Sequence, residues 1–231
     1  MRQPVLVARL AVRELWMTFR LLVLLVAFVG TSAVVILFPA APSITLARLA
    51  LGLGVATVLA SGVAAWSLAE ERTAGRAGWM VSRSVSRGTY LVGWFVALSF
   101  ITVGGILGAG ILGWLALFSL PLRLDGAAFV TSMAAIGATA AAAIACGLAA
   151  GAVLRGAFAF GLAVAVCAGL GVAAWQLAGP VPAVPGAAYL LLGDLGSASV
   201  LPSAMRAAGV GLVLAAVLLS VARVAIERAD L

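Results

Sequence analysis

The sequence contains no histidine, and all 14 of its basic residues are arginine, so lysine is missing as well. Charged residues make up only 9% of the 231 positions. Without lysine the chain has no phosphate-binding loop of the G-x-x-x-x-G-K type, which excludes an ATPase of that class. Without histidine it lacks the commonest general base and metal ligand. The composition therefore argues against a catalytic or nucleotide-binding protein.

Apolar residues dominate the sequence, at 65%, and the mean hydropathy is +1.26. A helix needs about 20 mostly apolar residues to cross a bilayer, and six runs of suitable length follow one another. We expect an all-α, polytopic membrane protein with a single transmembrane domain over residues 1–231 and no cofactor. Cys146 and Cys167 lie inside apolar runs, which favours packing over a disulfide or a metal site. The predicted spans are 21–38, 46–69, 90–118, 127–150, 157–178 and 207–222.

The first 20 residues precede the long apolar runs and carry four arginines. On one helix their spacings of 7, 4 and 7 place these arginines in a narrow stripe. We expect an interfacial helix over 1–20, with the arginines at the phosphates and the other face at the acyl boundary. A signal peptide is less favoured, because 21–38 is longer than the usual apolar core of about 7–15 residues. The stripe is Arg2, Arg9, Arg13 and Arg20, and the opposite face is Val7, Ala8, Ala11, Leu15, Phe19 and Leu22.

The arginines are distributed unevenly between the two sides that six spans would create. Eleven fall on the side of the N-terminus, of segment 70–89 and of the C-terminus, and three fall on the other side. Because positive residues favour the cytoplasmic side, we expect both termini in the cytoplasm of a bacterium and a multi-pass protein of its plasma membrane. The same bias explains the net charge of +7 without a nucleic-acid partner.

Segment 70–89 is the most concentrated polar stretch of the sequence. Read as a helix from Glu70, it has its acids at the start, where they complement the helix dipole. Trp79, Met80 and Val81 supply an apolar patch, and Arg72, Arg76, Arg83 and Arg87 recur at spacings of 4, 7 and 4. We expect a short cytoplasmic helix that docks into a groove of a soluble partner. The alternative is an ordinary basic loop.

Glycines in the third predicted span match G-x-G-x-x-G over residues 108–113. The match lies within a span rather than after a strand, and no acid follows about 20 residues later, so it does not indicate dinucleotide binding. Gly104 and Gly108 instead form a small-xxx-small pair, which predicts close helix packing. Gly147 and Gly151 repeat this spacing in the fourth span.

None of the predicted spans contains an aspartate, glutamate or arginine deep in its apolar run. Buried ionisable groups mark proton-coupled transporters and ion pathways. Their absence argues against both, so that uphill transport by this protein would need energy from a partner.

The sequence around segment 70–89 resembles permease subunits of type-2 ATP-binding cassette (ABC) exporters. Their loop pattern is Glu, three residues, Gly, an apolar patch, Pro-Val-Ser-Arg and then Gly-Lys. Here residues 71–75 read Glu-Arg-Thr-Ala-Gly, residues 84–87 read Ser-Val-Ser-Arg, and 93–94 read Gly-Trp. Ser84 replaces the usual proline and Trp94 the usual lysine. Segment 226–230 is also similar to the end of family members.

The resemblance implies the architecture and partners of the family. Residues 1–20 would be the elbow helix, 70–89 the coupling helix, and 179–205 an external or re-entrant loop. The chain would pair with a second copy or a paralogue, and separate cytoplasmic ATPase subunits would bind ATP and Mg. It would export a hydrophobic or amphipathic substrate without catalytic residues of its own. The residues implied in ATPase docking are Glu71, Gly75, Trp79, Met80, Ser86 and Arg87.

Two other functions stay open at this point. One is a subunit like the B subunit of the haem exporter of cytochrome c maturation, which also has six spans, although this chain has no histidine for haem. The other is a membrane-embedded lipid-modifying enzyme. That enzyme would have to rely on Glu70, Glu71, Asp125 and Asp194, of which Asp125 and Asp194 are predicted to stand singly on the outer side.

Overall fold

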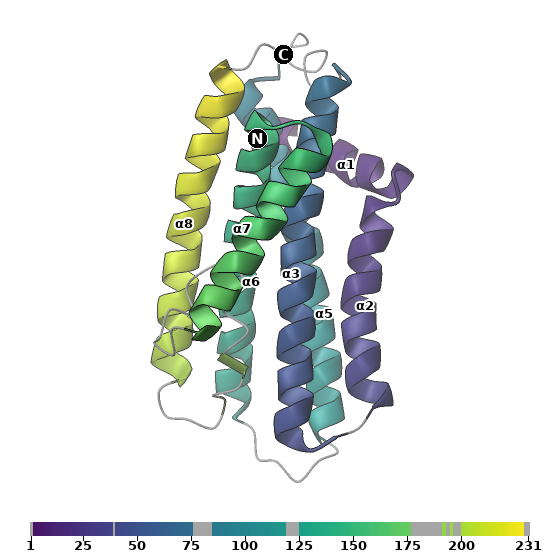
Figure 1. The fold of residues 1–231 in the computed structure, drawn as a ribbon, viewed down its shortest axis with the longest axis vertical. Coiled ribbons are helices and arrows are strands. Elements are labelled where there is room, and N and C mark those ends of the chain that lie inside the picture. The colour runs from purple at the N-terminus through teal and green to yellow at the C-terminus, as the bar shows by residue number, and fades with distance from the viewer. Residues whose placement is uncertain are drawn as a thin grey trace.

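The computed structural model describes residues 2–38, 40–75, 85–118, 125–176, 191–192, 195 and 200–228. Within these ranges the regular structure is helical, and no strand occurs. Six long helices run side by side along the length of the molecule, and a shorter one, α1, lies across them near one end (Figure 1). The helices are α1 (Arg2–Met17), α2 (Arg20–Leu37), α3 (Pro42–Thr73), α5 (Arg87–Phe118), α6 (Gly126–Val153), α7 (Gly156–Gln176) and α8 (Val200–Arg228).

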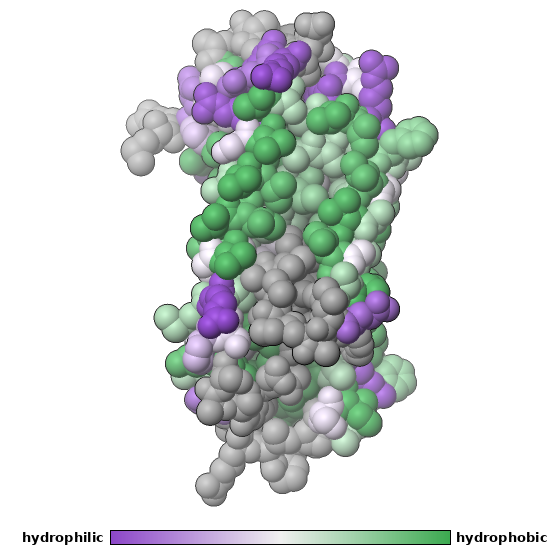
Figure 2. All heavy atoms as spheres, turned by 60° about the vertical axis from the view of Figure 1, so that its left-hand side comes forward, coloured by the Kyte–Doolittle hydropathy of each residue, from purple (hydrophilic) through white to green (hydrophobic). Residues whose placement is uncertain are grey.

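Six of these helices are long and apolar enough to cross a membrane, which confirms the predicted number of spans. Figure 2 shows hydrophobic side chains gathered along the middle of the molecule, with hydrophilic side chains toward its ends. The protein is therefore a membrane protein with several spans. The helices extend beyond the predicted spans, most clearly α3, which covers 42–73 rather than 46–69, and α8, which covers 200–228 rather than 207–222.

The first helix differs from the predicted interfacial helix in two respects. It ends at Met17, and Phe19 adopts a left-handed conformation with φ of 58°, so Arg20 begins α2 and leaves the arginine stripe. The face formed by Val7, Ala11 and Leu15 is buried in the bundle instead of facing acyl chains. Two members of the predicted stripe, Arg9 and Arg13, are exposed.

The alanine-rich helix α6 lies at the centre of the bundle and packs against α3, α5, α7 and α8. Its small residues let neighbouring backbones approach closely. A Cβ on Gly147 would clash with the carbonyl oxygen of Ser61, and one on Gly151 would clash with that of Ala65. This pair therefore packs α6 against α3, as its spacing predicts.

The other predicted glycine pair does not pack within the described chain. Gly104 and Gly108 are exposed, and nothing lies within 4 Å of a Cβ placed on either residue. Their neighbours on α5 take this role: Gly105 faces Phe28 of α2, and Gly110 faces Met133 of α6. The face of α5 that meets other helices is rotated away from Gly104 and Gly108, so this pair does not make the close helix contact that its spacing predicted.

Both ends of the described chain lie at the same end of the bundle (Figure 1). The end of α3 and the beginning of α5 lie there as well, so the polar segment between them is attached at this end. An even number of spans gives this arrangement.

Candidate functional site

The candidate site is the junction at this end of the bundle, where α3 ends, α5 begins and α8 ends. Glu70 lies in the last turns of α3 and forms an ion pair with Arg20 of α2. Arg20 also donates to the hydroxyl of Ser67 at 3.3 Å, and its guanidinium lies 5.3 Å from the ring centroid of Trp66. The first turn of α2 is thereby fixed against the last turns of α3.

The two adjacent acids, Glu70 and Glu71, do not lie where the sequence predicted them. Glu70 and Glu71 belong to the C-terminal end of α3, not to the start of a new helix. A helix C-terminus carries partial negative charge and disfavours carboxylates, so each acid needs a compensating partner. Arg20 provides it for Glu70, and Glu71, which is only 4% exposed, accepts a hydrogen bond of 3.2 Å from the hydroxyl of Tyr90 on α5.

Arg72 connects the same turn of α3 to a third helix. Its Nη1 donates to the carbonyl oxygen of Gly151 at 2.9 Å, near the end of α6. The last carbonyls of a helix have no partner within it, and a cation beside them is favourable. The last turns of α3 are therefore joined to α2, α5 and α6 by three successive charged residues.

Gly75 marks the end of α3. Its φ is 72°, in the left-handed region, where glycine is favoured because it has no Cβ. Its N–H donates to the carbonyl oxygen of Arg72 at 3.2 Å, and its surroundings are open. Gly75 therefore provides the turn with which the chain leaves α3. Trp79 and Met80, predicted to dock the partner, lie outside the described residues.

Ser86 caps the helix that follows. Its Oγ accepts the backbone N–H of Thr89 at 3.1 Å and lies 2.7 Å from the Thr89 hydroxyl. A serine that accepts this N–H is a strongly preferred N-cap. Ser86 therefore fixes the position at which α5 begins.

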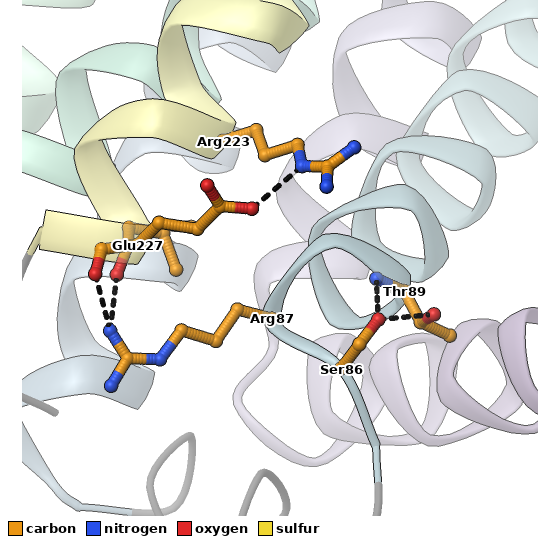
Figure 3. Close-up of polar contacts among 6 residues, drawn as sticks. Ser86, Arg87, Thr89, Arg223 and Glu227 are labelled. Carbon is orange, nitrogen blue, oxygen red and sulfur yellow. Dashed lines mark hydrogen bonds and ion pairs between the residues drawn. The ribbon is translucent and has the colours of Figure 1, made fainter.

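Arg87, the next residue, connects α5 to the end of α8. Its Nη1 donates to the carbonyl oxygens of Ile226 at 3.0 Å and of Glu227 at 2.8 Å (Figure 3). On α8 itself, Nε of Arg223 donates to Oε1 of Glu227 at 2.7 Å. The two bonds of Arg87 bring together residues about 140 positions apart in the sequence.

The junction attaches both ends of segment 76–84 to helices that are distant in the sequence. On one side, segment 76–84 is attached to the end of α3, which is bonded to α2, α5 and α6. On the other side, it is attached to the capped start of α5, which is bonded to α8. Among the described residues no three His, Cys, Asp or Glu side chains come together as a possible metal site. Cys146 and Cys167 are both free thiols.

The structure brings Glu71, Gly75, Ser86 and Arg87 to this junction, and their role in docking stays a prediction. The sequence analysis did not predict the residues that contact them. Arg223 and Glu227 have the spacing of four that favours a helical ion pair, which was the available signal. The roles of Arg20 and Tyr90 depend on contacts between helices that are far apart in the sequence, and no local sequence pattern predicts such contacts.

No protein-family model matches this sequence, and no curated protein matches it either.

Proposed function

We propose that this protein is the transmembrane permease subunit of an ABC exporter, driven by ATP hydrolysis on a separate cytoplasmic subunit. The observation that carries the proposal is the junction described above. Both attachments of segment 76–84 are bonded to spans that are distant in sequence, α2 and α6 on the α3 side and α8 on the α5 side. A force applied to this segment would therefore reach several spans at once.

Helix length supports a partner that lies away from the membrane. α3 and α5 have 32 residues each, about 48 Å at 1.5 Å per residue, whereas the hydrocarbon core is about 30 Å thick. Figure 1 shows α3 reaching past the level of α1 at this end of the bundle. The end of α3, to which segment 76–84 is attached, thus extends past α1.

The outer surface supports assembly with a second permease chain, a copy or a paralogue. Only 22% of the apolar windows of α7 and α8 is buried within the chain, against 78% for α6. Such helices need either lipid or another protein against their open faces.

The spans combine a few buried hydroxyls with large apolar side chains on their outer faces. The hydroxyls of Ser99, Thr102 and Ser132 are buried and have no hydrogen-bond partner among the described residues. Exposed residues of the spans are large and apolar, such as Phe100 and Phe158. These surfaces suit a hydrophobic or amphipathic substrate better than a small ion.

Coexpression with each ABC ATPase encoded in the same genome tests the proposal. We expect a stable complex in detergent that hydrolyses ATP, whereas the purified chain alone binds no nucleotide. Tight ATP binding by the isolated chain would contradict the assignment. So would failure of the chain to associate with every ABC ATPase of its genome.

A further inference from the structure

A cavity of about 400 Å³ lies between the beginnings of α1 and α5 and the end of α8. It opens at the end of the bundle that carries the junction, where the apolar surface of the spans gives way to charged residues. Its lining combines one cation with hydroxyl groups, and it includes Pro4, Ser86, Thr89, Ser220 and Arg223. Gly88 also lines it and lies next to Arg223, since a Cβ on Gly88 would be 3.4 Å from Nε of Arg223.

Arg223 presents most of its hydrogen-bond donors away from its carboxylate partner. It binds Glu227 through Nε alone, and Figure 3 shows its two terminal nitrogens directed away from that carboxylate. Those terminal nitrogens have no acceptor among the described residues. The fork of a guanidinium matches two oxygens of one phosphate or carboxylate group.

The hydroxyl pair at the start of α5 adds another donor. Ser86 and Thr89 share one hydrogen bond of 2.7 Å, which uses only one of their two O–H groups. The other O–H has no acceptor among the described residues. The cavity wall therefore offers several N–H donors and one O–H donor. The carboxylate of Glu227, one turn along α8, already accepts from Arg223.

We propose that this cavity binds the phosphate of an anionic phospholipid headgroup. Arg223 and the Ser86–Thr89 pair would donate to its oxygens. Arg87 adds positive charge nearby while it holds the carbonyls at the end of α8. The site depends on the membrane location of the chain and not on its proposed transport function.

Apolar residues that continue from the cavity favour a lipid over a free phosphate. Val92 lines the cavity, and the same face of α5 continues at intervals of four residues with Val96 and Phe100, all exposed. On α8 the exposed Val213 and Val217 precede Ser220 of the cavity wall. An acyl chain attached to the bound phosphate would lie against these side chains.

Native mass spectrometry of the full chain in detergent tests the proposal, with dioleoylphosphatidylglycerol and dioleoylphosphatidylcholine as probes. We expect one phosphatidylglycerol to be retained in preference to phosphatidylcholine. Arg223→Gln should weaken retention by about tenfold or more, because it removes charge-assisted hydrogen bonds. Ser220→Leu, which fills the cavity and leaves the charge in place, should do the same. Glu227→Gln should strengthen retention, because it removes the carboxylate that competes for Arg223.

The matched control is Arg206→Gln, which removes one arginine from the opposite end of the same helix, α8, and should leave retention unchanged. Equal retention by wild type and Arg223→Gln would overturn the proposal. Equal losses in Arg223→Gln and Arg206→Gln would also overturn it, because they would indicate a general charge effect. If inorganic phosphate at equal concentration displaces the lipid, the site binds free anions and the lipid assignment is wrong.

Discussion

Arg87, the first residue of α5, donates a hydrogen bond of 2.8 Å to the backbone carbonyl of Glu227, in the last turn of α8. The acceptor is one of the final carbonyls of a helix, which have no partner within it. The side chain of Arg87 thus donates to carbonyl oxygens at the end of α8 and fixes this end to the start of α5. Because of this bond, a movement of segment 76–84 would displace the end of α8 as well.

Loss of this bond should loosen the end of α8 locally. We expect Arg87→Gln to increase hydrogen–deuterium exchange of amides 222–228. A hydrogen bond to a charged donor contributes about 1.5–3 kcal/mol, and the contribution should lie at the lower end of this range because the site is exposed. Exchange in the first turns of α8, near Val200, should not change. Unchanged exchange at 222–228 would show that the contact contributes nothing in solution.

The ion pair between Arg20 and Glu70 should couple α2 to α3 energetically. The side chain of Arg20 is 11% exposed and that of Glu70 is 44% exposed, so the pair lies between a buried and a surface ion pair. A double-mutant cycle with Arg20→Gln and Glu70→Gln, measured by unfolding in mixed micelles, should give a coupling free energy of about 1–2 kcal/mol. Additive effects of the two substitutions would refute the coupling.

The two glycine pairs should respond oppositely to a single methyl group. Gly151→Ala places its Cβ against the carbonyl oxygen of Ala65, and we expect a loss of about 1–3 kcal/mol of unfolding free energy. Gly104→Ala enters open space and gains helix propensity worth about 0.5–1 kcal/mol. Thermal stability in detergent measures both variants.

The opposite result for the two glycine variants would contradict the packing of the helices. A large loss of stability in Gly104→Ala, but not in Gly151→Ala, would mean that the packing between α3 and α6 is wrong. A loss in Gly104→Ala that occurs only in the assembled complex would instead place α5 at a contact with a second chain.

The orientation of the protein is open to a direct measurement. Reporter fusions at both termini and at residue 80 should give cytoplasmic signals, and fusions at residues 123 and 195 should give external ones. The arginine bias predicts this pattern. An external signal at residue 80 would remove segment 70–89 from any cytoplasmic partner.

The number of spans was predictable because it depends only on the length and composition of apolar runs, and both are properties of the sequence. The boundaries were less predictable. Glu70 and Glu71 read as the start of a helix because acids favour that position. The structure continues α3 through them, since Arg20 and Tyr90 compensate their charge from other helices.

The break between α1 and α2 shows a second limit of sequence reasoning. No proline or glycine marks it, and the turn is made by Phe19 in a left-handed conformation that bulky residues rarely adopt. The regular spacing of the arginines therefore continued through the break, and Arg20 was assigned to the wrong helix. Its actual environment, between Glu70, Ser67 and Trp66, is formed only when α2 packs on α3.

The central claim is that segment 76–84 transmits force from an ATPase, and Trp79→Ala tests it most directly. Burial of such a side chain is worth about 1.5–3 kcal/mol, so copurification with the coexpressed ATPase should weaken by roughly 10- to 100-fold. Membrane expression should not change. The matched control is Trp175→Ala, near the end of α7 farthest from the junction, which should keep full association and ATP hydrolysis. If Trp79→Ala keeps both while Trp175→Ala loses both, segment 76–84 does not dock an ATPase and the account is wrong.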